Sequence, residues 1–517
     1  MVSYSTVGGP NGSGSESSRG SRRKSSRTIK EQNLPHGQAS WISSNVNLLN
    51  TIVGAGTLAM PLAMSHMGIL LGTFVIVWSG MMAAFGLYLQ SQCARYLDRG
   101  TSSFFALSQI TYPNAAVLFD AAIAIKCFGV GVSYLIIIGD LMPGVATGFS
   151  QGAESIPILM DRKFWVTIFM FVVIPLSYLR RLDSLKYTSI VALVSIGYLV
   201  ILVVYHFIKG DTMADRGPIR VVEWGGVVPT LQSFPVIVFA YTCHQNMFSI
   251  LNEIKDNSHR RTTSVIVASI GSAASIYVLV AITGYLSFGN AVKGNIVGMY
   301  IPSTASTIAK AAIVILVMFS YPLQVHPCRA SVDAVLKWRP NSWKKRHSPA
   351  GSPTRSAPLL SGGHVRPTAK NDTMSETRFA VITTFIIALS YFTAVTVSSL
   401  DKVLAYVGST GSTSISFILP GLFYYKISAP DSIHHQRLTK EDDEGESDDD
   451  VEEGQGLLGQ SIKRIVPWRK TILRKLSLAL AIYGRRGTEI ERSGLPPKLY
   501  CILKSQIGKA PGVYMAF

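Results

Sequence analysis

The chain has 517 residues, of which 48% are hydrophobic and 15% are charged. Soluble proteins have about 25% charged residues, so the composition argues against a soluble enzyme or binding domain. The net charge of +18 is compatible with nucleic acid or anionic lipid as a partner, and the positions of the charges must decide between them. The cysteines are odd in number and scattered, so they predict neither a disulfide framework nor a zinc site: Cys93, Cys127, Cys243, Cys328 and Cys501.

Apolar blocks of membrane-helix length fill most of the chain after its first 40 residues. Residues 1–40 are rich in Ser, Gly and Arg, which predicts a disordered basic cytosolic tail rather than a signal peptide. The blocks lie at 43–64, 69–94, 115–141, 164–179, 187–208, 228–250, 263–288, 305–326, 379–398 and 403–425. The sequence therefore predicts an all-α membrane domain over residues 41–425 with ten spans.

The basic residues fix the expected orientation. With the N-terminus in the cytosol, the loops predicted to be cytosolic carry more Lys and Arg than the opposite loops, as the positive-inside rule requires. The largest contribution is a basic, low-complexity insert at 329–378, expected to be a solvated cytosolic loop, with docking to anionic lipid as the alternative. Because topology explains the positive charge, nucleic-acid binding is not expected.

The composition changes after the tenth span. Residues 426–470 contain the acidic run EDDEGESDDDVEE and are predicted to form a cytosolic linker. An eleventh span could begin at Ile472, but the apolar stretch at 476–484 reaches only about half of membrane length before Arg485 and Arg486. Residues 471–517 are therefore expected to hold an incomplete eleventh helix, lying in the membrane interface or divergent, and a tail without a membrane pattern.

Two spans contain polar residues and glycines that interrupt the membrane pattern. The first span has Asn47, Asn50 and Thr51 before a glycine pair, Gly54 and Gly56. The sixth span carries the run YTCHQN at 241–246 at membrane depth. Irregular backbone is tolerated in a membrane where it lines a protein cavity. Close packing of small residues is the alternative at the first break, and a polar stretch facing a wet vestibule is the alternative at the sixth.

Breaks five spans apart are typical of a transporter built from two inverted repeats, with the substrate at the midplane between them. A half-helix N-terminus offers N–H groups to a carboxylate, and unwound carbonyls accept from an ammonium group, so an amino acid fits both. The residues predicted to bind the substrate are Asn50, Thr51, Val53, Gly54, Ala55, Gly56, Thr57, Phe239, Tyr241 and Thr242.

Ionisable side chains inside spans are functional candidates because they are costly to insert. His244 titrates near neutral pH and is a candidate proton carrier, with a neutral hydrogen-bonded histidine as the alternative. Lys126 is a candidate of the same kind or a structurally paired lysine. Asp140 lies near the end of the third span, where a water-facing position on the lumenal side is the simple explanation for it. No acidic or basic residue stands beside the breaks in the sequence to indicate a charged substrate.

Several strings resemble one known family. They are NLLNTIVGAGTLAMP (47–61), YLIIIGDLMP (134–143), FAYTCHQNMF (239–248) and VGSTGSTSISFILPGLFYY (407–425). They are similar to the amino acid/auxin permease family, in particular its branch of fungal vacuolar amino acid transporters. The resemblance implies a LeuT-type fold of 5+5 inverted repeats, with 10 to 11 transmembrane helices, of which helices 1 and 6 are broken. It also implies a vacuolar membrane location and no enzymatic activity.

The resemblance adds expectations about the coupling ion. In sodium-coupled relatives the asparagine before IVG, here Asn50, resembles a cation ligand, with Ser320 of the eighth span available to help. Asp140 belongs to a recurring family motif, which makes it a candidate second proton carrier or a structural anchor. The residues themselves leave proton and sodium coupling open, and the acidified vacuole favours the proton. The expected coupling-ion residues are His244, Asp140, Lys126, Asn50 and Ser320, with no metal or other cofactor.

The leading hypothesis is a secondary transporter that moves amino acids across the vacuolar membrane, coupled to protons, by alternating access around the two breaks. The alternative is an amino-acid-sensing receptor that signals to cytosolic regulators through its loops. The sequence contains no HExxH, GxSxG or P-loop motif, so an enzyme is not expected. The amino acids transported and the direction of transport are not readable from the sequence.

Overall fold

The structure is a computed structural model, and it describes residues 37–97, 100–113, 116–150, 152–179, 188–213, 216–337, 374–432, 434–436 and 471–486. Its helices begin with α2 (Trp41–Ile52), α3 (Ala55–Met67), α4 (Ile69–Ala94), α5 (Phe104–Thr111), α6 (Ala116–Phe149), α7 (Pro157–Met160), α8 (Arg162–Ser177) and α9 (Thr188–Lys209). They continue with α10 (Val227–Ala240), α11 (His244–Glu253), α12 (His259–Phe288), α13 (Thr304–Lys337), α15 (Glu376–Thr396), α16 (Leu400–Val407) and α17 (Leu419–Ile427).

Short irregular turns connect or interrupt these helices. Three are 3₁₀ turns: η2 (Ala153–Ser155), η4 (Gly289–Ala291) and η5 (Ile296–Met299). Two are π-helical turns, η6 (Gly408–Ser412) and η7 (Ser414–Ile418), between α16 and α17. Wide turns of this kind often mark functional sites, and here they fall on the hydroxyl-rich run GSTGSTS of the tenth predicted span.

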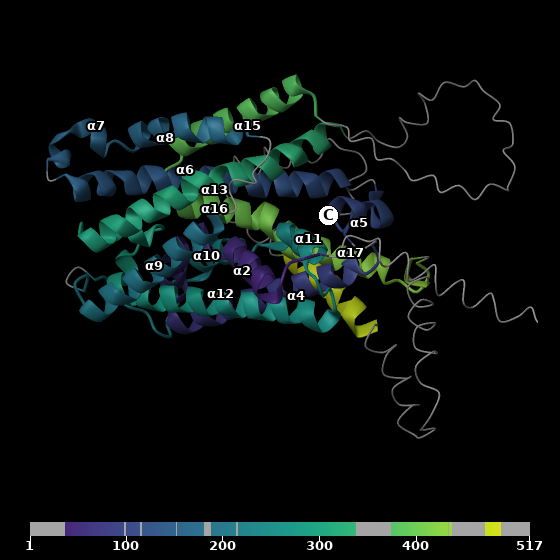
Figure 1. Ribbon diagram of the computed structural model, residues 1–517. Helices are drawn as coiled ribbons and strands as arrows, with labels where there is room; N and C mark the ends of the chain where they lie inside the picture. The colour runs from purple at the N-terminus through teal and green to yellow at the C-terminus, as the bar shows by residue number, and fades with distance from the viewer. Residues whose placement is uncertain are drawn as a thin grey trace, which may run out of the picture.

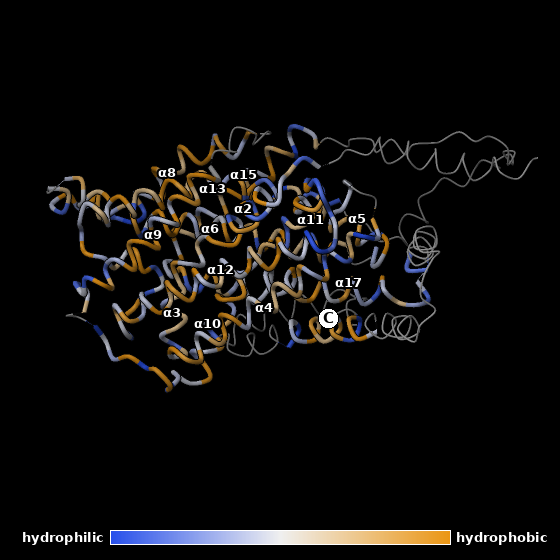
Figure 2. The backbone as a smooth tube through the Cα atoms, turned by 60° about the horizontal axis from the view of Figure 1, so that its bottom comes forward, coloured by the Kyte–Doolittle hydropathy of each residue, from blue (hydrophilic) through white to orange (hydrophobic). Residues whose placement is uncertain are grey.

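Each of the ten predicted spans coincides with one helix or with one interrupted helix. Among the described residues, seven helices are long and apolar enough to cross a membrane, and the bent pair α2–α3 makes an eighth. The fourth predicted span, α8, has 16 residues and is shorter than these, and the tenth is divided by the π turns. Hydrophobic residues follow the helices, whereas hydrophilic ones gather in the connecting segments (Figure 2).

The helices form two groups, each of which takes helices from both halves of the chain (Figure 1). One group joins α2–α3 and α4 of the first half to α10–α11 and α12 of the second. The other joins α6 and α8 of the first half to α13 and α15 of the second, with α13 packed along α6. Equivalent spans of the two halves therefore lie in the same group, as a 5+5 inverted repeat requires.

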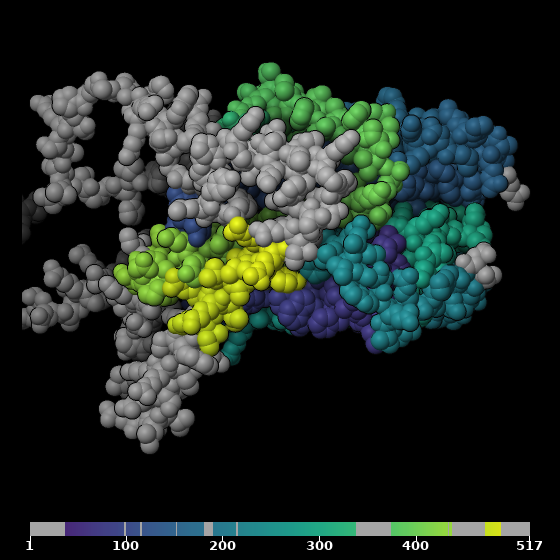
Figure 3. Space-filling view, turned by 180° about the vertical axis from the view of Figure 1, so that it is seen from behind, coloured from purple at the N-terminus to yellow at the C-terminus, as the bar shows by residue number. Residues whose placement is uncertain are grey.

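The segments after the tenth span are described only in part. Residues 471–486 form a helix that runs antiparallel to α17: a Cβ on Gly421 would meet Ser477, and a Cβ on Gly484 would meet Phe417 and Ile418. Figure 3 shows this helix in yellow against the green of α17. These contacts pack the helix on the bundle. At 1.5 Å per residue its 16 residues span about 24 Å, which is less than the roughly 30 Å of a membrane core.

The predicted segments outside the membrane domain fall largely beyond the described residues. Residues 1–36, 338–373, 437–470 and 487–517 lie outside them, and these ranges hold most of the predicted tail, insert, linker and C-terminal segment. The basic insert predicted from residue 329 begins later, because α13 continues to Lys337. The buried Arg329 fixes this extension by donating to the Ser177 carbonyl and to Thr383 Oγ1, at 3.3 and 3.1 Å.

Candidate functional site

The first break separates α2 from α3 at Val53 and Gly54, and the two helices meet at 55°. The N–H of Val53 donates to the Leu49 carbonyl at 2.8 Å and ends α2. The N–H of Thr57 donates to the Gly54 carbonyl at 3.0 Å and begins α3. The first N–H groups of a helix have no partner within it and carry a positive partial charge, so the start of α3 presents donors at mid-span.

The second break lies between α10 and α11, where Tyr241, Thr242 and Cys243 are not helical. Thr242 Oγ1 donates to the Val238 carbonyl at 2.8 Å, and Ser416 Oγ donates to Thr242 Oγ1 at 3.2 Å. The last carbonyls of α10 form the negative end of its dipole, and those of Phe239 and Ala240 accept from the Thr242 N–H and the Tyr277 hydroxyl at 3.0 and 2.9 Å. The two breaks therefore bring a donor end and an acceptor end together.

One tyrosine joins the two breaks. The hydroxyl of the fully buried Tyr277 in α12 lies 2.7 Å from the Ile52 carbonyl and 2.9 Å from the Ala240 carbonyl, and it can donate to either. The helices touch at the same level, since a Cβ on Gly56 would lie 2.6 Å from Ala240 Cβ. Nothing in the sequence distinguishes this tyrosine from others in apolar spans, so sequence reasoning missed it.

A cavity of about 370 Å³ lies at the breaks. It is bounded by α2, α3, α6, α9, α10, α11 and α13, and thus by both helix groups. Its lining consists of Asn47, Asn50, Thr51, Ile52, Val53, Gly54, Ala55, Gly56, Lys126, Val130, Tyr134, Ala192, Phe239, Ala240, Thr242, Asn246, Leu316, Val317, Ser320, Leu323 and Gln324. Small residues, amides and hydroxyls dominate this surface, which suits a compact polar ligand.

Most residues predicted to bind the substrate line this cavity. They are Asn50, Thr51, Val53, Gly54, Ala55, Gly56, Phe239 and Thr242. Thr57 and Tyr241 do not line it: Thr57 is fully buried, and the Tyr241 ring packs edge-on against Tyr277 with centroids 5.1 Å apart. A Cβ on Gly54 meets no atom within 4 Å, so this glycine faces open space at the break.

Of the five residues predicted to carry the coupling ion, three line the cavity and two do not. Asn50, Ser320 and Lys126 line the cavity, and His244 and Asp140 do not. His244 is fully buried against α4, with Nε2 3.2 Å from the Ala83 carbonyl. Asp140 accepts from Arg162 Nε at 2.9 Å, and Arg162 also donates to the Val397 carbonyl at 3.3 Å. Such a pairing is what a structural anchor, the alternative role for Asp140, would require.

Several lining residues were not among the predicted ones. Asn246 belongs to the polar run of the sixth span, but the predicted site stopped at Thr242. Its Nδ2 donates to Thr51 Oγ1 at 3.1 Å, and Thr51 Oγ1 donates to the Asn47 carbonyl at 3.0 Å. These bonds connect the two broken spans across the cavity. Val130, Tyr134 and Gln324 come from helices without a break, so no local pattern marked them.

The cavity opens toward one end of the bundle only. Its exposed lining residues, Asn47 and Asn246, lie on the α2 and α11 side of the breaks. On the α3 and α10 side, Gly56, Phe239 and Ala240 are buried. A second cavity, of about 580 Å³, lies beyond this closed layer between α3, α10 and α16, where His66 Nδ1 is 2.7 Å from Ser233 Oγ.

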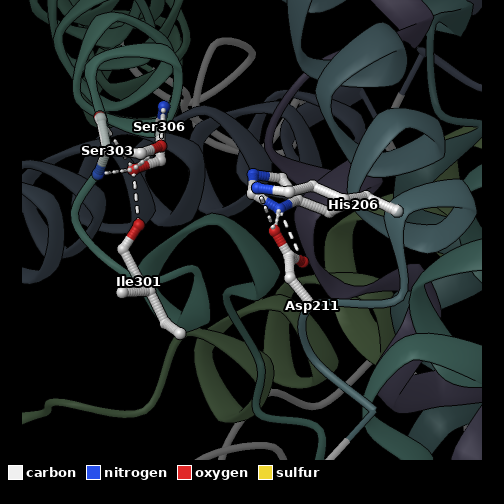
Figure 4. Close-up of polar contacts among 6 residues, drawn as sticks. His206, Asp211, Ile301, Ser303 and Ser306 are labelled. Carbon is white, nitrogen blue, oxygen red and sulfur yellow. Dashed lines mark hydrogen bonds and ion pairs between the residues drawn. The ribbon is translucent and has the colours of Figure 1, made fainter.

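Polar contacts hold the closed end together (Figure 4). His206 Nδ1 near the end of α9 lies 2.9 Å from both carboxylate oxygens of Asp211. Its ring stacks on Tyr300, with centroids 4.4 Å apart. Burial raises the pKa of the Asp211 carboxyl, but hydrogen bonds and charges from His206 and Lys209 outweigh burial, so the pKa lies below its ordinary value. Ser306 Oγ donates to the Ile301 carbonyl at 2.8 Å, which fixes the turn before α13, and the stacking of His206 on Tyr300 joins this turn to α9.

Residues 37–442 match the family described as transmembrane amino acid transporter protein. The chain belongs to this family. It is 45% identical to vacuolar amino acid transporter 5 of Schizosaccharomyces pombe, over 76% of this chain and 87% of the relative. It is 40% identical to vacuolar amino acid transporter 6 of Saccharomyces cerevisiae, over 75% of this chain and 90% of the relative. The predicted family and the transport of amino acids across a membrane are thereby confirmed.

Two solved structures share the fold of this amino acid transporter. One is MhsT in complex with L-phenylalanine, with a TM-score of 0.51 and 11% identity, covering 88% of this chain and 99% of MhsT. The other is the inward-facing conformation of Mhp1, with a TM-score of 0.53 and 10% identity, covering 89% of this chain and 96% of Mhp1. The likeness in fold, with helices 1 and 6 broken, confirms the predicted LeuT-type architecture.

Proposed function

We propose that this transporter moves amino acids across the vacuolar membrane by alternating access around the two breaks, driven by a proton gradient. The names of its fungal relatives support the vacuolar membrane. The observation that carries the mechanism is the cavity at the breaks, which is bounded by both helix groups and open toward one end only.

The cavity offers complementary ends to a zwitterion. The carboxylate fits at the start of α3, where the N–H groups of Ala55 and Gly56 and the helix dipole favour negative charge. The ammonium group fits at the end of α10, where the carbonyls of the unwound residues accept. Gly54 leaves room for the ligand to approach the backbone, because no neighbouring atom stands where its Cβ would be.

The two helix groups supply the moving parts. Bonds from Tyr277 to both breaks, and from Asn246 to Thr51, join α2, α10, α11 and α12 on one side of the cavity. The salt bridge of Arg162 with Asp140 and its bond to the Val397 carbonyl join the start of α8 to α6 and to the end of α15 on the other side. Relative motion of two internally bonded groups would open the closed end and shut the open one.

The proton is the proposed coupling ion, with the N-terminus in the cytosol. Under this orientation the cavity of the structure opens to the cytosol, and the His206 and Asp211 contacts lie on the lumenal side. Lys126 is the proposed proton carrier, because it is the one expected carrier with an ionisable side chain in the cavity lining. Asn50 and Ser320 supply oxygen atoms to the same cavity lining that can hold water or a cation.

Uptake by sealed vesicles that contain the purified protein tests this proposal. A mixture of labelled amino acids is offered under an imposed pH gradient, an imposed sodium gradient or no gradient. Saturable uptake that follows the pH gradient supports the proposal. Uptake that follows only sodium overturns the coupling ion, and binding without flux of any amino acid would favour the sensing receptor instead.

A further inference from the structure

A basic basin lies at the end of the bundle toward which the substrate cavity opens. It has a volume of about 1000 Å³ and lies between the segment before α2, the end of α4, the loop before α5 and the turn from α11 to α12. Figure 1 shows α5 and α11 at this end. None of the residues that line the basin lines the substrate cavity, so the transport mechanism leaves the basin without a role.

Three cationic side chains from separate parts of the chain line this basin. Arg95 directly follows α4, Lys255 follows α11, and Arg261 lies in the first turn of α12. The one acidic lining residue is Asp256, whose Oδ1 accepts from the Ser258 N–H at 2.9 Å. Serines and side-chain amides make up most of the remaining lining and can donate further hydrogen bonds. The basin therefore carries a net positive charge and suits an anion with several acceptor oxygens.

Hydrogen bonds join the walls of the basin to one another. The Ala39 N–H donates to the Glu253 carbonyl at 2.9 Å, and the Lys255 N–H donates to the Ala39 carbonyl at 3.0 Å, so the segment before α2 is paired with the end of α11. Asn252 Oδ1 accepts from the Ser102 N–H at 3.1 Å, and Asn252 Nδ2 donates to the Ser102 carbonyl at 2.8 Å. These bonds hold the backbone of the basin in place before a ligand arrives, which lowers the cost of binding.

The basin lies at the level where two spans leave the membrane. The apolar span α4 ends at Ala94, one residue before Arg95, and the apolar residues of α12 begin at Val265, one turn after Arg261. Basic side chains at this level lie beside the headgroups of the adjacent leaflet and attract anionic lipid. The positive-inside rule accounts for basic residues at span ends, but it does not require them to line one concave surface.

We infer that this basin binds the phosphorylated headgroup of an anionic lipid, with phosphate oxygens accepting from Arg95, Lys255 and Arg261. Arginine can meet a phosphate with two parallel hydrogen bonds. Three cations around a basin of this size favour a headgroup with more than one phosphate, as on a phosphorylated inositol lipid. With the N-terminus in the cytosol, as proposed above, this lipid belongs to the cytosolic leaflet, but its binding does not depend on transport.

Titration of the purified protein in detergent tests this inference. Short-chain phosphatidylinositol bisphosphate and short-chain phosphatidylserine are added separately, and the rise in unfolding temperature gives the affinity for each lipid. The wild type should prefer the bisphosphate. That preference should fall about tenfold in Arg261→Gln, as expected when a hydrogen bond between charged groups is lost. It should rise in Asp256→Asn, which removes the repelling charge and keeps an acceptor for the Ser258 N–H.

Arg260→Gln is the matched control. Arg260 precedes Arg261 in the same turn and is exposed as well, but it does not line the basin. This variant should keep most of the preference for the bisphosphate. Equal losses in Arg260→Gln and Arg261→Gln would overturn the inference, because the attraction would then be spread over the whole basic surface. An unchanged preference in Arg261→Gln, or a weaker one in Asp256→Asn, would overturn it too.

Inositol trisphosphate distinguishes a lipid from a soluble source of the same chemistry, because it carries ring phosphates without acyl chains. It should bind more weakly than the bisphosphate lipid. If it binds as tightly, the assignment to a lipid is overturned and the ligand is a soluble phosphate. Because none of these titrations involves uptake, absence of uptake of any amino acid would refute the proposed function and leave this inference standing.

Discussion

The two breaks have the same sequence signature but use their polar residues differently. At the first break, an unbroken run from Asn50 to Gly56 lines the cavity. At the second break, Thr242 and Asn246 line it, while Tyr241 before them and His244 between them are buried against other helices. Polar residues at a break can thus face a ligand or fasten the break to its neighbours.

The difference follows from how each break is supported. The first break spans two residues, and Gly54 adds no side chain that needs a place. The second break is flanked by large side chains, of which His244 packs against α4 and Tyr241 against Tyr277 of α12. Gln90 Nε2 donates to the His244 carbonyl at 2.9 Å, and a Cβ on Gly86 would lie 2.8 Å from His244 Nε2. We therefore interpret the first break as the ligand-binding one and the second as partly a structural lock.

Valine at each of two neighbouring glycines gives the largest expected effects. Gly54→Val should reduce uptake on the order of a hundredfold with little change in thermal stability, because its side chain enters the open space at the break. Gly56→Val should destabilise the protein by about 1–3 kcal/mol, since its Cβ would lie 2.6 Å from Ala240 Cβ. Uptake and thermal unfolding are measured for both variants. If Gly54→Val and Gly56→Val lower the unfolding temperature equally, the predicted difference between the two glycines is wrong.

Removing one hydroxyl tests whether the two breaks act together. Tyr277→Phe leaves the Ile52 and Ala240 carbonyls without this donor, which should cost about 1–3 kcal/mol of stability. Uptake should fall as well, because both helix ends lose a fixed position. Tyr285→Phe is a suitable control, since that hydroxyl bonds Asn290 and Arg220 away from the breaks. If thermal unfolding and uptake of Tyr277→Phe match the wild type, the two breaks are not joined in this way.

The histidine of the second break provides a smaller effect. His244→Ala should lower stability by about 1–2 kcal/mol, as expected for a lost buried hydrogen bond and some packing. Uptake by the folded protein should still follow the pH gradient, because His244 does not line the cavity. Vesicles with and without the gradient measure this directly. Uptake that no longer responds to the gradient would restore His244 as the proton carrier.

The smallest effect is expected far from both breaks. Because the pKa of Asp211 is lowered in the folded protein, its carboxylate stabilises the fold at pH values above the unfolded value of about 3.9. This contribution is lost as the pH falls through the lower, folded value. Asp211→Asn should therefore unfold slightly below the wild-type temperature from pH 5 to 7, and the difference should begin to shrink below about pH 4 and vanish once the pH is below the folded pKa. A difference that grows in acid would contradict this sign.

Much of the fold could be predicted because membrane helices have a strong local signature. Length and apolarity located the ten spans, and glycine with polar residues located both breaks. Helix ends were less certain: α6 and α13 extend to Phe149 and Lys337, beyond their apolar cores. In α13 a buried arginine, Arg329, continues the helix by bonding to Ser177 and Thr383, and hydropathy alone does not detect this.

The site could be predicted only where it is local in sequence. The run from Asn50 to Gly56 could be recognised from its local pattern of polar residues and glycines. Lys126, Tyr277 and Gln324 come from spans without such a pattern, and helix packing decides which of their residues face the site. The direction of a side chain at an unwound turn is also undetermined by sequence, which is why Tyr241 and His244 were expected in the site. The sequence also does not distinguish a carboxylate that carries a proton from one that pairs with an arginine, as Asp140 does with Arg162.

Protection of a cysteine in the cavity tests most directly whether amino acids bind there. Gln324→Cys places a thiol in the lining, and the four described native cysteines are buried. Labelling by a soluble thiol reagent should be slowed by a transported amino acid at Gln324→Cys and unaffected at the exposed Asn257→Cys. If a transported amino acid leaves the labelling rate of Gln324→Cys unchanged at saturating concentration, the cavity at the breaks is not the binding site.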